Sequence, residues 1–378
     1  MSLRYGKRAH TEFHLPKEIK VMKKLIPLIL SSLLLVTSFT GCGNRVTNEY
    51  YDAHFFGFDT YITLRFAKED ADGKAISEEY LKNTADECAA ILNDIDLLLS
   101  AHNEDSQIYA LNREINMMVD SSGELLSVLD TAYTISELTN GAYDPTLGDL
   151  VELWNVSDGG PVPEDVEIME SLLHTGTDKI VVKGNTISKV DSLTKIDFGG
   201  VGKGYATQEL LKYLSTTDIP YGLVSLGGNI GVFGTKEDGE TYKVGIKDPN
   251  DPEGIIGYLY LSNGFLSVSG DYERYFEEDG VRYHHIIDPV TGYPAESGLR
   301  SVACVSSNGA AADALSTALF VMGEEEALKL YEDGTLVFEA IFVTDANEII
   351  LTDGLMKNGS FELTNDNYTI FGAPAENN

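Results

Sequence analysis

The feature that limits the fold most is a succession of short strand-like segments in the second half of the chain. β-branched and aromatic residues recur in clusters between residues 221 and 306, and residues typical of turns separate them. Strand and helix do not alternate regularly there, which argues against a doubly wound parallel sheet. The sequence therefore predicts an α+β fold with mixed or antiparallel sheets flanked by helices. A single strand is expected at residues 55–66, and helices are expected at 76–100, 104–112, 124–138, 200–214, 310–322 and 324–331.

The composition narrows the classes of function. The 378 residues include 27 Lys and Arg against 60 Asp and Glu, a formal charge of −33, with 43% hydrophobic residues. That apolar content suffices for a packed core, so global disorder is not expected. Sequence-independent nucleic-acid binding requires Lys and Arg that neutralise phosphates, so no nucleic-acid partner is expected. Three cysteines are too few for a disulfide framework.

The first 41 residues have a charge of the opposite sign from the rest, with seven of the basic and two of the acidic residues. Lys23 and Lys24 precede an apolar run at 25–36, and Cys42 follows small residues. This arrangement is typical of a secretory signal, and the run is too short for a permanent transmembrane helix. Cys42 is the expected lipidation site of a bacterial lipoprotein, with Phe39 in place of the usual leucine. The alternative is an ordinary free thiol.

This N-terminal pattern predicts three parts of the chain. Residues 1–41 are expected to be a signal peptide with an upstream leader, 42–51 a lipid-anchored tether, and 52–378 the folded domain. Lipid on Cys42 would place the protein on the extracytoplasmic face of the bacterial cell membrane.

Two glycine-rich segments could carry chemistry. Residues 195–206 (KIDFGGVGKGYA) lead from a strand through glycines into a helix. Amides at a helix N-terminus attract anions, glycines let a phosphate approach the backbone, and Lys203 could add a positive charge. The alternative is an ordinary glycine turn with a solvated lysine. Residues 223–230 (LVSLGGNI) place paired glycines between two strands, where a tight turn or bulge is the better interpretation.

Two further segments carry titratable side chains. His284 and His285 are neighbours on an expected strand, so they point to opposite faces and at most one faces a given site. His285, three residues before Asp288, could be a base that an acid orients, although a single histidine is usually structural. Asp313 and Thr317 share one helix face among small apolar residues. They suit Mg²⁺, and the alternative is a hydrogen bond between the two side chains.

Together and in this order, the segments resemble the ApbE family, the FAD:protein FMN transferases. The resemblance runs from about residue 55 to residue 323. The segments that carry it are FDTYITL, LLLSAHNEDSQIYALN, GAYDPTLGDLVELW, KIDFGGVGKGYA, YGLVSLGGNI, SGDYERYF, YHHIIDPVTGYP and AAADALSTALFVMG. Many members of the family are exported lipoproteins, which agrees with the N-terminal pattern.

The resemblance implies a reaction. The family cleaves the pyrophosphate of FAD, transfers FMN through a phosphoester bond to a Thr or Ser of a target protein, and releases AMP, with Mg²⁺ as cofactor. The implied acceptors are membrane redox subunits of the Na⁺-pumping NADH:quinone oxidoreductase and Rnf type, or exported flavoproteins. Two alternatives remain open. One is a Mg²⁺-dependent FAD pyrophosphatase that gives FMN and AMP, and the other is a non-catalytic FAD-binding lipoprotein.

The resemblance also implies site residues, in a pocket for the flavin between two subdomains. His285 is the implied catalytic base and Asp288 its catalytic neighbour. Phe58 stands where methionine is common in the family, and His102 stands where many members have tyrosine. The implied metal ligands are the Gly200 carbonyl, Asp313 and Thr317, and the implied FAD contacts are Asp197, Lys203, Asp144, Thr146, His102, Phe58 and Thr291.

Overall fold

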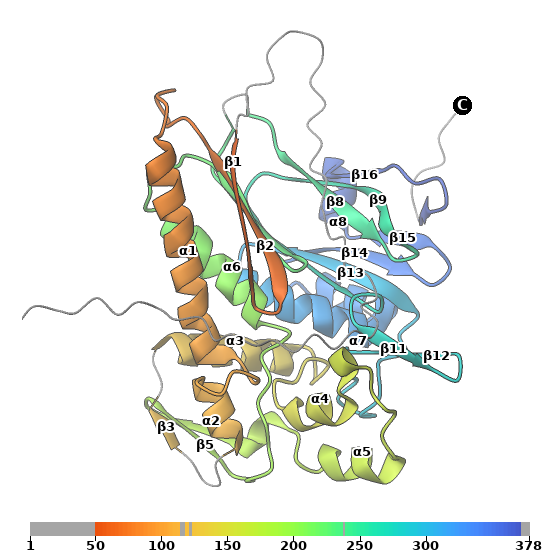
Figure 1. The fold of residues 1–378 in the computed structure, drawn as a ribbon. Helices are drawn as coiled ribbons and strands as arrows, with labels where there is room; N and C mark the ends of the chain where they lie inside the picture. The colour runs from red at the N-terminus through yellow and green to blue at the C-terminus, as the bar shows by residue number, and fades with distance from the viewer. Residues whose placement is uncertain (1–49, 114–117, 121–122, 237–238, 372–378) are drawn as a thin grey trace, which may run out of the picture.

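The computed structural model describes residues 50–113, 118–120, 123–236 and 239–371 (Figure 1). The expected signal segment, Cys42 and nearly all of the tether lie outside the described residues, and they stay predictions. Among the helices that the structure describes, none combines the length and the apolar character needed to cross a membrane.

A nine-stranded sheet forms the centre of the molecule, in the order β1-β2-β6-β7-β10-β13-β14-β15-β17. Its neighbouring strands are antiparallel except for the β15–β17 pair. This arrangement confirms the predicted α+β class. The strands are β1 (Tyr50–Gly57), β2 (Thr60–Ala67), β6 (Gly222–Leu226), β7 (Asn229–Phe233), β10 (Gly264–Gly270), β13 (Leu299–Ser306), β14 (Glu339–Thr344), β15 (Glu348–Leu351) and β17 (Thr369–Ile370).

A smaller sheet covers one face of the main sheet. It consists of β8 (Tyr242–Asp248), β9 (Asp251–Leu261) and β16 (Phe361–Leu363), with α8 (Asp353–Asn358) beside it. Apolar residues of β8 and β9 pack against alternate residues of β6, β7, β14 and β15 in one buried cluster. Because side chains of a strand alternate between faces, the other residues of these main-sheet strands face the opposite side.

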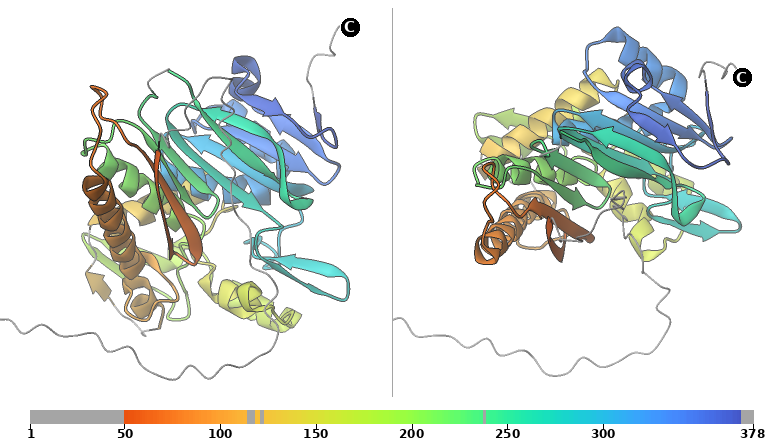
Figure 2. Two further views of the ribbon diagram at one scale, coloured as in Figure 1. Left: turned by 45° about the horizontal axis from the view of Figure 1, so that its top comes forward. Right: turned by 90° about the horizontal axis from the view of Figure 1, so that it is seen from above.

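Helices cover that opposite face (Figures 1 and 2). They are α1 (Glu78–Leu99), α3 (Gly123–Leu138), α6 (Gly202–Leu214) and α7 (Gly309–Asp333), and they share the largest apolar cluster with β2, β13 and β14. Gly323 interrupts α7 with φ of 75° and ψ of 173°, at the boundary predicted between helices 310–322 and 324–331. Positive φ of this size favours glycine.

A smaller lobe lies below the main sheet in Figure 1. Part of this lobe packs around Trp154, whose indole nitrogen donates to the Gly292 carbonyl at 2.7 Å. The strands β3, β5 and β4 form a separate three-stranded sheet there. The elements of this lobe are α2 (Gln107–Arg113), β3 (Met118–Asp120), α4 (Gly148–Trp154), α5 (Asp165–Leu172), β4 (Ile180–Lys183), β5 (Thr186–Lys189), β11 (Tyr275–Glu278) and β12 (Val281–His284).

The single strand expected at residues 55–66 is wrong. The chain forms the β1–β2 hairpin, with a two-residue turn at Phe58 and Asp59 whose φ angles are 51° and 52°. Two positive φ values define the tight turn that suits right-twisted strands, and that turn is usually signalled by Asn or Gly. Neither residue type is present at these two positions, so the pattern did not indicate the turn.

The crossing of α6 and α7 depends on Gly204. A Cβ at Gly204 would lie 2.1 Å from the Gly309 carbonyl oxygen, which is backbone and cannot move cheaply. We expect Gly204→Ala to lower the free energy of unfolding by about 1–3 kcal/mol or more, as overpacking does. Chemical denaturation measures this, with Gly123→Ala as the control because a Cβ at Gly123 has open space around it. Equal midpoints for the two variants would contradict the packing argument.

Candidate active site

Asp313 is the centre of the buried polar cluster where α6, α7 and the main sheet meet. The residue is 4% exposed. Its Oδ2 accepts from the Gly204 amide at 2.9 Å, and its Oδ1 accepts from Asn229 Nδ2 at 3.0 Å and Ser267 Oγ at 2.9 Å. A carboxylate has about four acceptor positions, so about one remains for a further partner. The carboxylate is thus held rigidly by neutral donors and still has a lone pair to offer.

Thr317 and Gly200 lie beside this carboxylate. Thr317 follows Asp313 by one helical turn, and its hydroxyl is 3.2 Å from Ser269 Oγ. A Cβ placed on Gly200 would lie 3.3 Å from Thr317 Oγ1, so the glycine backbone adjoins the threonine hydroxyl. Within the described ranges there is no group of three or more His, Cys, Asp or Glu that could hold a metal. One carboxylate with hydroxyl and carbonyl oxygens is a donor set that fits Mg²⁺ bound together with oxygens of a ligand.

The glycine turn before α6 involves two of the predicted FAD contacts, Asp197 and Lys203. Asp197 Oδ1 accepts from the Gly199 amide at 2.7 Å, and Lys203 Nζ donates to the Gly199 carbonyl at 2.8 Å. Asn112 holds the preceding residue, bonding both the amide and the carbonyl of Ile196 at 2.8 and 2.7 Å. Side-chain hydrogen bonds from Asp197, Lys203 and Asn112 therefore define the conformation of this turn. Sequence reasoning did not single out Asn112.

The segment around Asp144 adjoins the glycine turn. The Asp197 amide donates to the Pro145 carbonyl at 2.8 Å. Asp144 Oδ1 accepts from the Thr146 amide at 2.8 Å and from the Thr146 hydroxyl at 2.6 Å, while the Gly176 amide donates to that hydroxyl at 2.6 Å. Burial raises the pKa of Asp144, and the Thr146 hydrogen bonds oppose that shift. Asp144 and Thr146 therefore form one rigid turn next to Asp197.

The two histidines have different surroundings, although only His284 belongs to a strand, because β12 ends there and His285 begins the following loop. His284 is 7% exposed, its Nε2 lies 3.1 Å from the Ala295 carbonyl oxygen, and its ring packs edge-on against Phe320. Burial lowers the pKa of His284. His285 lies just past the end of β12, with Nδ1 3.2 Å from the Arg274 carbonyl oxygen. A neutral His285 with the proton on Nδ1 donates to that carbonyl, which leaves Nε2 as a free acceptor.

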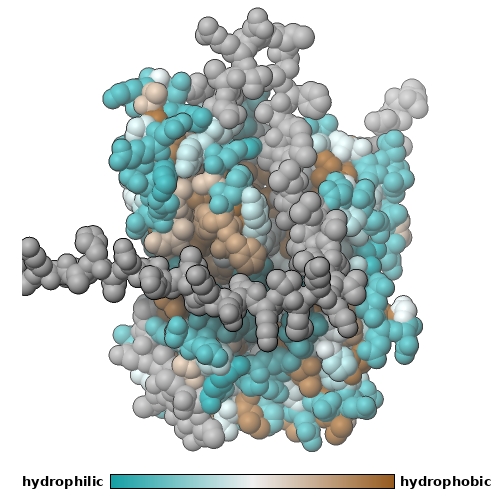
Figure 3. Space-filling view, viewed as in Figure 1, coloured by the Kyte–Doolittle hydropathy of each residue, from teal (hydrophilic) through white to brown (hydrophobic). Residues whose placement is uncertain are grey.

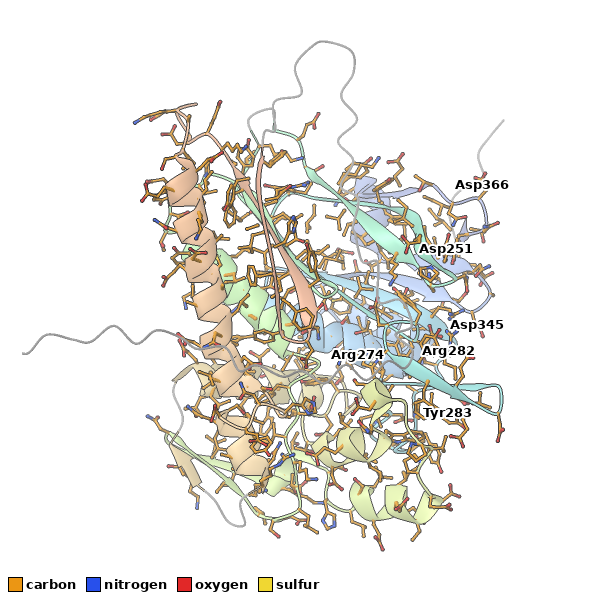
Figure 4. All side chains as sticks on the ribbon, viewed as in Figure 1. Asp251, Arg274, Arg282, Tyr283, Asp345 and Asp366 are labelled. Carbon is orange, nitrogen blue, oxygen red and sulfur yellow. The ribbon has the colours of Figure 1, made fainter. Side chains whose placement is uncertain are left out.

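Positive charge surrounds His285 in an otherwise acidic protein. Burial is the main cause that lowers the pKa of His285 to about 3, and the charges of Arg274, His284 and Lys203 act in the same direction. The hydrogen bond to the Arg274 carbonyl opposes them. Arg274 directly precedes β11, and Figure 4 shows it near the middle of the molecule. The site thus offers cations to an anionic ligand and a neutral imidazole next to them.

This pKa has a consequence for stability. The folded-state pKa of about 3 is below the ordinary value of 6.5, so the unfolded chain binds more protons between these pH values. The contribution of His285 to stability is therefore complete above pH 6.5 and is lost as the pH falls toward 3. We expect His285→Gln to flatten the decline of the denaturation midpoint in that range. Parallel declines for the parent and His285→Gln would contradict this.

Asp288 does not orient His285 in this structure. Asp288 Oδ1 accepts from the Val290 amide at 2.8 Å, and Oδ2 accepts from Thr291 Oγ1 at 3.1 Å. The Arg274 carbonyl occupies the orienting position that an acid was expected to fill. Asp288 and Thr291 shape the loop that follows His285, and their predicted roles toward the reaction and FAD stay predictions.

Phe58 and His102 both lie in turns between secondary-structure elements. Phe58 is in the β1–β2 turn and packs partly on the main core. A positive φ at a phenylalanine is strained, and such strain gathers at functional sites. Phe56 of the same hairpin is 73% exposed, and Figure 3 shows a pale brown patch where Figure 1 has this hairpin. His102 is exposed in the turn after α1, where its amide donates to Ser100 Oγ at 3.3 Å.

The structure adds residues that the sequence did not single out. Asn229, Ser267 and Ser316 join the Asp313 cluster, and Ser316 Oγ donates to the Asp313 carbonyl at 2.9 Å. The period-two spacing of Ser267 and Ser269 on a strand could have indicated one polar face. The paired glycines before Asn229 are a turn, as expected, with φ of 52° and 90°.

The chain was compared with known proteins. The ApbE family model matches residues 58–342. An FAD:protein FMN transferase from Haemophilus influenzae is 32% identical over 340 residues, which cover 86% of this chain and 94% of that protein. One from Treponema pallidum is 33% identical over 305 residues, which cover 73% and 83%.

Solved structures agree with these matches. The crystal structure of an ApbE protein from Thermotoga maritima has a TM-score of 0.74 and 33% identity, covering 83% of this chain and all of that one. A flavin transferase ApbE from Vibrio cholerae has a TM-score of 0.69 and 28% identity, covering 78% and 95%. The sequence matches and the shared fold show that the chain belongs to the ApbE family.

Proposed function

We propose that this protein transfers FMN from FAD to a Thr or Ser hydroxyl of an acceptor protein and releases AMP. The observation that carries the proposal is the convergence of an oxygen-donor cation site, a glycine turn with Lys203 and a neutral His285 at one place. The names of the relatives support flavin transfer as the chemistry.

The first task of the site is to hold a pyrophosphate in a protein of net charge −33. Lys203 Nζ is held at the glycine turn by its hydrogen bond to the Gly199 carbonyl. From this position the ammonium can donate to a phosphate oxygen instead. The N-terminus of α6 adds backbone amides and its helix dipole. Asp313, Thr317 and the Gly200 carbonyl would hold Mg²⁺, which neutralises phosphate charge and stabilises the leaving AMP.

The second task is to activate the acceptor hydroxyl. His285 is neutral at pH 7 and has its Nε2 lone pair free, so it can take the proton of the attacking hydroxyl. The hydroxyl oxygen forms a bond to the phosphorus on the FMN side, and the bond from that phosphorus to the AMP oxygen breaks. The bound phosphates are negative, so they raise the pKa of His285 toward a value useful for a base.

We also propose that lipid on Cys42 anchors the enzyme on the extracytoplasmic face of the cell membrane. The N-terminal basic and apolar pattern supports this. Membrane redox subunits or exported flavoproteins would then be within reach of the site. Metabolic labelling with a fatty acid analogue, with Cys42→Ser as the control, tests the anchor.

One experiment tests the reaction. Purified protein is incubated with FAD and Mg²⁺, with and without a candidate acceptor, and the acceptor is examined by mass spectrometry and in-gel flavin fluorescence. Transfer adds the mass of FMN, less water, to a Thr or Ser of the acceptor and releases AMP. AMP and free FMN in both arms, with no acceptor modified, would indicate a pyrophosphatase. FAD binding without turnover in either arm would indicate a binding protein.

A further inference from the structure

Tyr143 has a buried hydroxyl without a partner beside the Asp313 site. The residue is 4% exposed, and its hydroxyl has no hydrogen-bond partner among the described residues. Its ring adjoins the proposed cation site, because a Cβ on Gly200 would lie 3.0 Å from Tyr143 Cε2 and 3.3 Å from Thr317 Oγ1. The ring edge and the threonine hydroxyl thus border the same glycine.

The hydroxyl remains a donor in this environment. Burial raises its pKa well above the ordinary value of 10, and the negative charges of Asp313, Asp197 and Asp144 raise it further. A protonated phenol can donate one hydrogen bond. All three carboxylates influence Tyr143, yet none of them accepts from its hydroxyl.

An unpartnered buried hydroxyl costs folding free energy, and most buried polar groups in native proteins have partners. A phenylalanine would fill the same space without this cost. The exceptions commonly mark a group whose partner is a ligand, ion or water. The position of Tyr143 beside Gly200 and Thr317 makes the ligand of this site the natural partner.

We propose that the Tyr143 hydroxyl donates a hydrogen bond to a ligand oxygen bound at the Gly200–Thr317 side of the site. That oxygen belongs either to a phosphate of FAD or to water held by the bound cation. The hydroxyl is enclosed in the free protein, so binding brings the acceptor in by a small shift of the glycine turn at Gly199 and Gly200. This inference rests on the proposed function and assigns Tyr143 as a ligand-binding residue of the same site.

Tyr143→Phe tests the proposal, because the change removes one oxygen and keeps the ring. Without ligand, the variant should be as stable as the parent or more stable in thermal denaturation. The affinity of the variant for FAD or for Mg²⁺ should fall by about 10- to 100-fold, the size expected for a hydrogen bond to a charged group. Calorimetry is carried out with Mg²⁺ alone, with FAD plus a chelator, and with both ligands together. A fall in affinity with Mg²⁺ alone assigns the acceptor to metal-bound water, and a fall with FAD plus a chelator assigns it to a phosphate.

Tyr272→Phe is the matched control. The Tyr272 hydroxyl is also buried, but it lies near Ser301, and its ring packs against Gly270 and below the Lys247 ammonium. This variant should bind FAD and Mg²⁺ as the parent does. Asp313→Asn provides the reference for a damaged site.

Two results would overturn this inference alone. Parent-like affinity of Tyr143→Phe in all three titrations would show that the hydroxyl contacts no ligand. A large loss of stability of the ligand-free variant would show that the hydroxyl already has a partner. A parent protein that binds neither FAD nor Mg²⁺ would overturn the proposed function together with this inference, so the two failures can be told apart.

Discussion

Asp313→Asn should lower kcat/KM for FAD by about 10²–10⁴-fold, because metal stabilisation of transition-state charge is typically worth several kcal/mol. The change removes the only carboxylate of the proposed cation site. It also turns one of the two acceptor oxygens into a donor, which would face either the Gly204 amide or the Asn229 and Ser267 donors. Both effects act against cation binding at this position.

Release of AMP from FAD over a range of Mg²⁺ concentrations measures this loss. Circular dichroism and thermal denaturation separate loss of the site from loss of the fold. Asp345→Asn is the control, since Asp345 is exposed and lies on the right in Figure 4, on the main-sheet side. Unchanged turnover and Mg²⁺ dependence in folded Asp313→Asn would remove Asp313 from the site.

His285→Ala should lower the rate of transfer by about 10²–10⁴-fold, the usual contribution of a general base. FAD affinity should change little, because the imidazole is neutral and bonds the Arg274 carbonyl rather than a phosphate. Single-turnover transfer to an acceptor gives the rate, and equilibrium titration with FAD gives the affinity.

His284→Ala is the matched control on the adjacent residue. His284 contacts the Ala295 carbonyl and Phe320, so its loss should reduce stability while the folded fraction keeps its turnover. An equal fall in FAD affinity and rate for His285→Ala would mean that His285 binds the substrate rather than activating the acceptor.

Local pattern accounts for much of the helical structure. The predicted helices 76–100 and 124–138 correspond to α1 (Glu78–Leu99) and α3 (Gly123–Leu138), because a repeat near 3.6 residues reflects one buried face. The short helices α4 and α5 were not predicted. Each has seven or eight residues, too few to show that repeat clearly.

The features of the candidate site also fall into two groups, those that the local sequence determined and those that the tertiary structure decided. The sequence by itself determined the features that depend on neighbours along the chain: glycines before α6, and Asp313 and Thr317 on one helix face. Only the tertiary structure decided that Asp313 bonds Asn229, that the Arg274 carbonyl holds His285, and that Tyr143 lies beside Gly200. These contacts join segments far apart in the sequence, and they depend on sheet register and on how closely helices pack, which local periodicity does not encode.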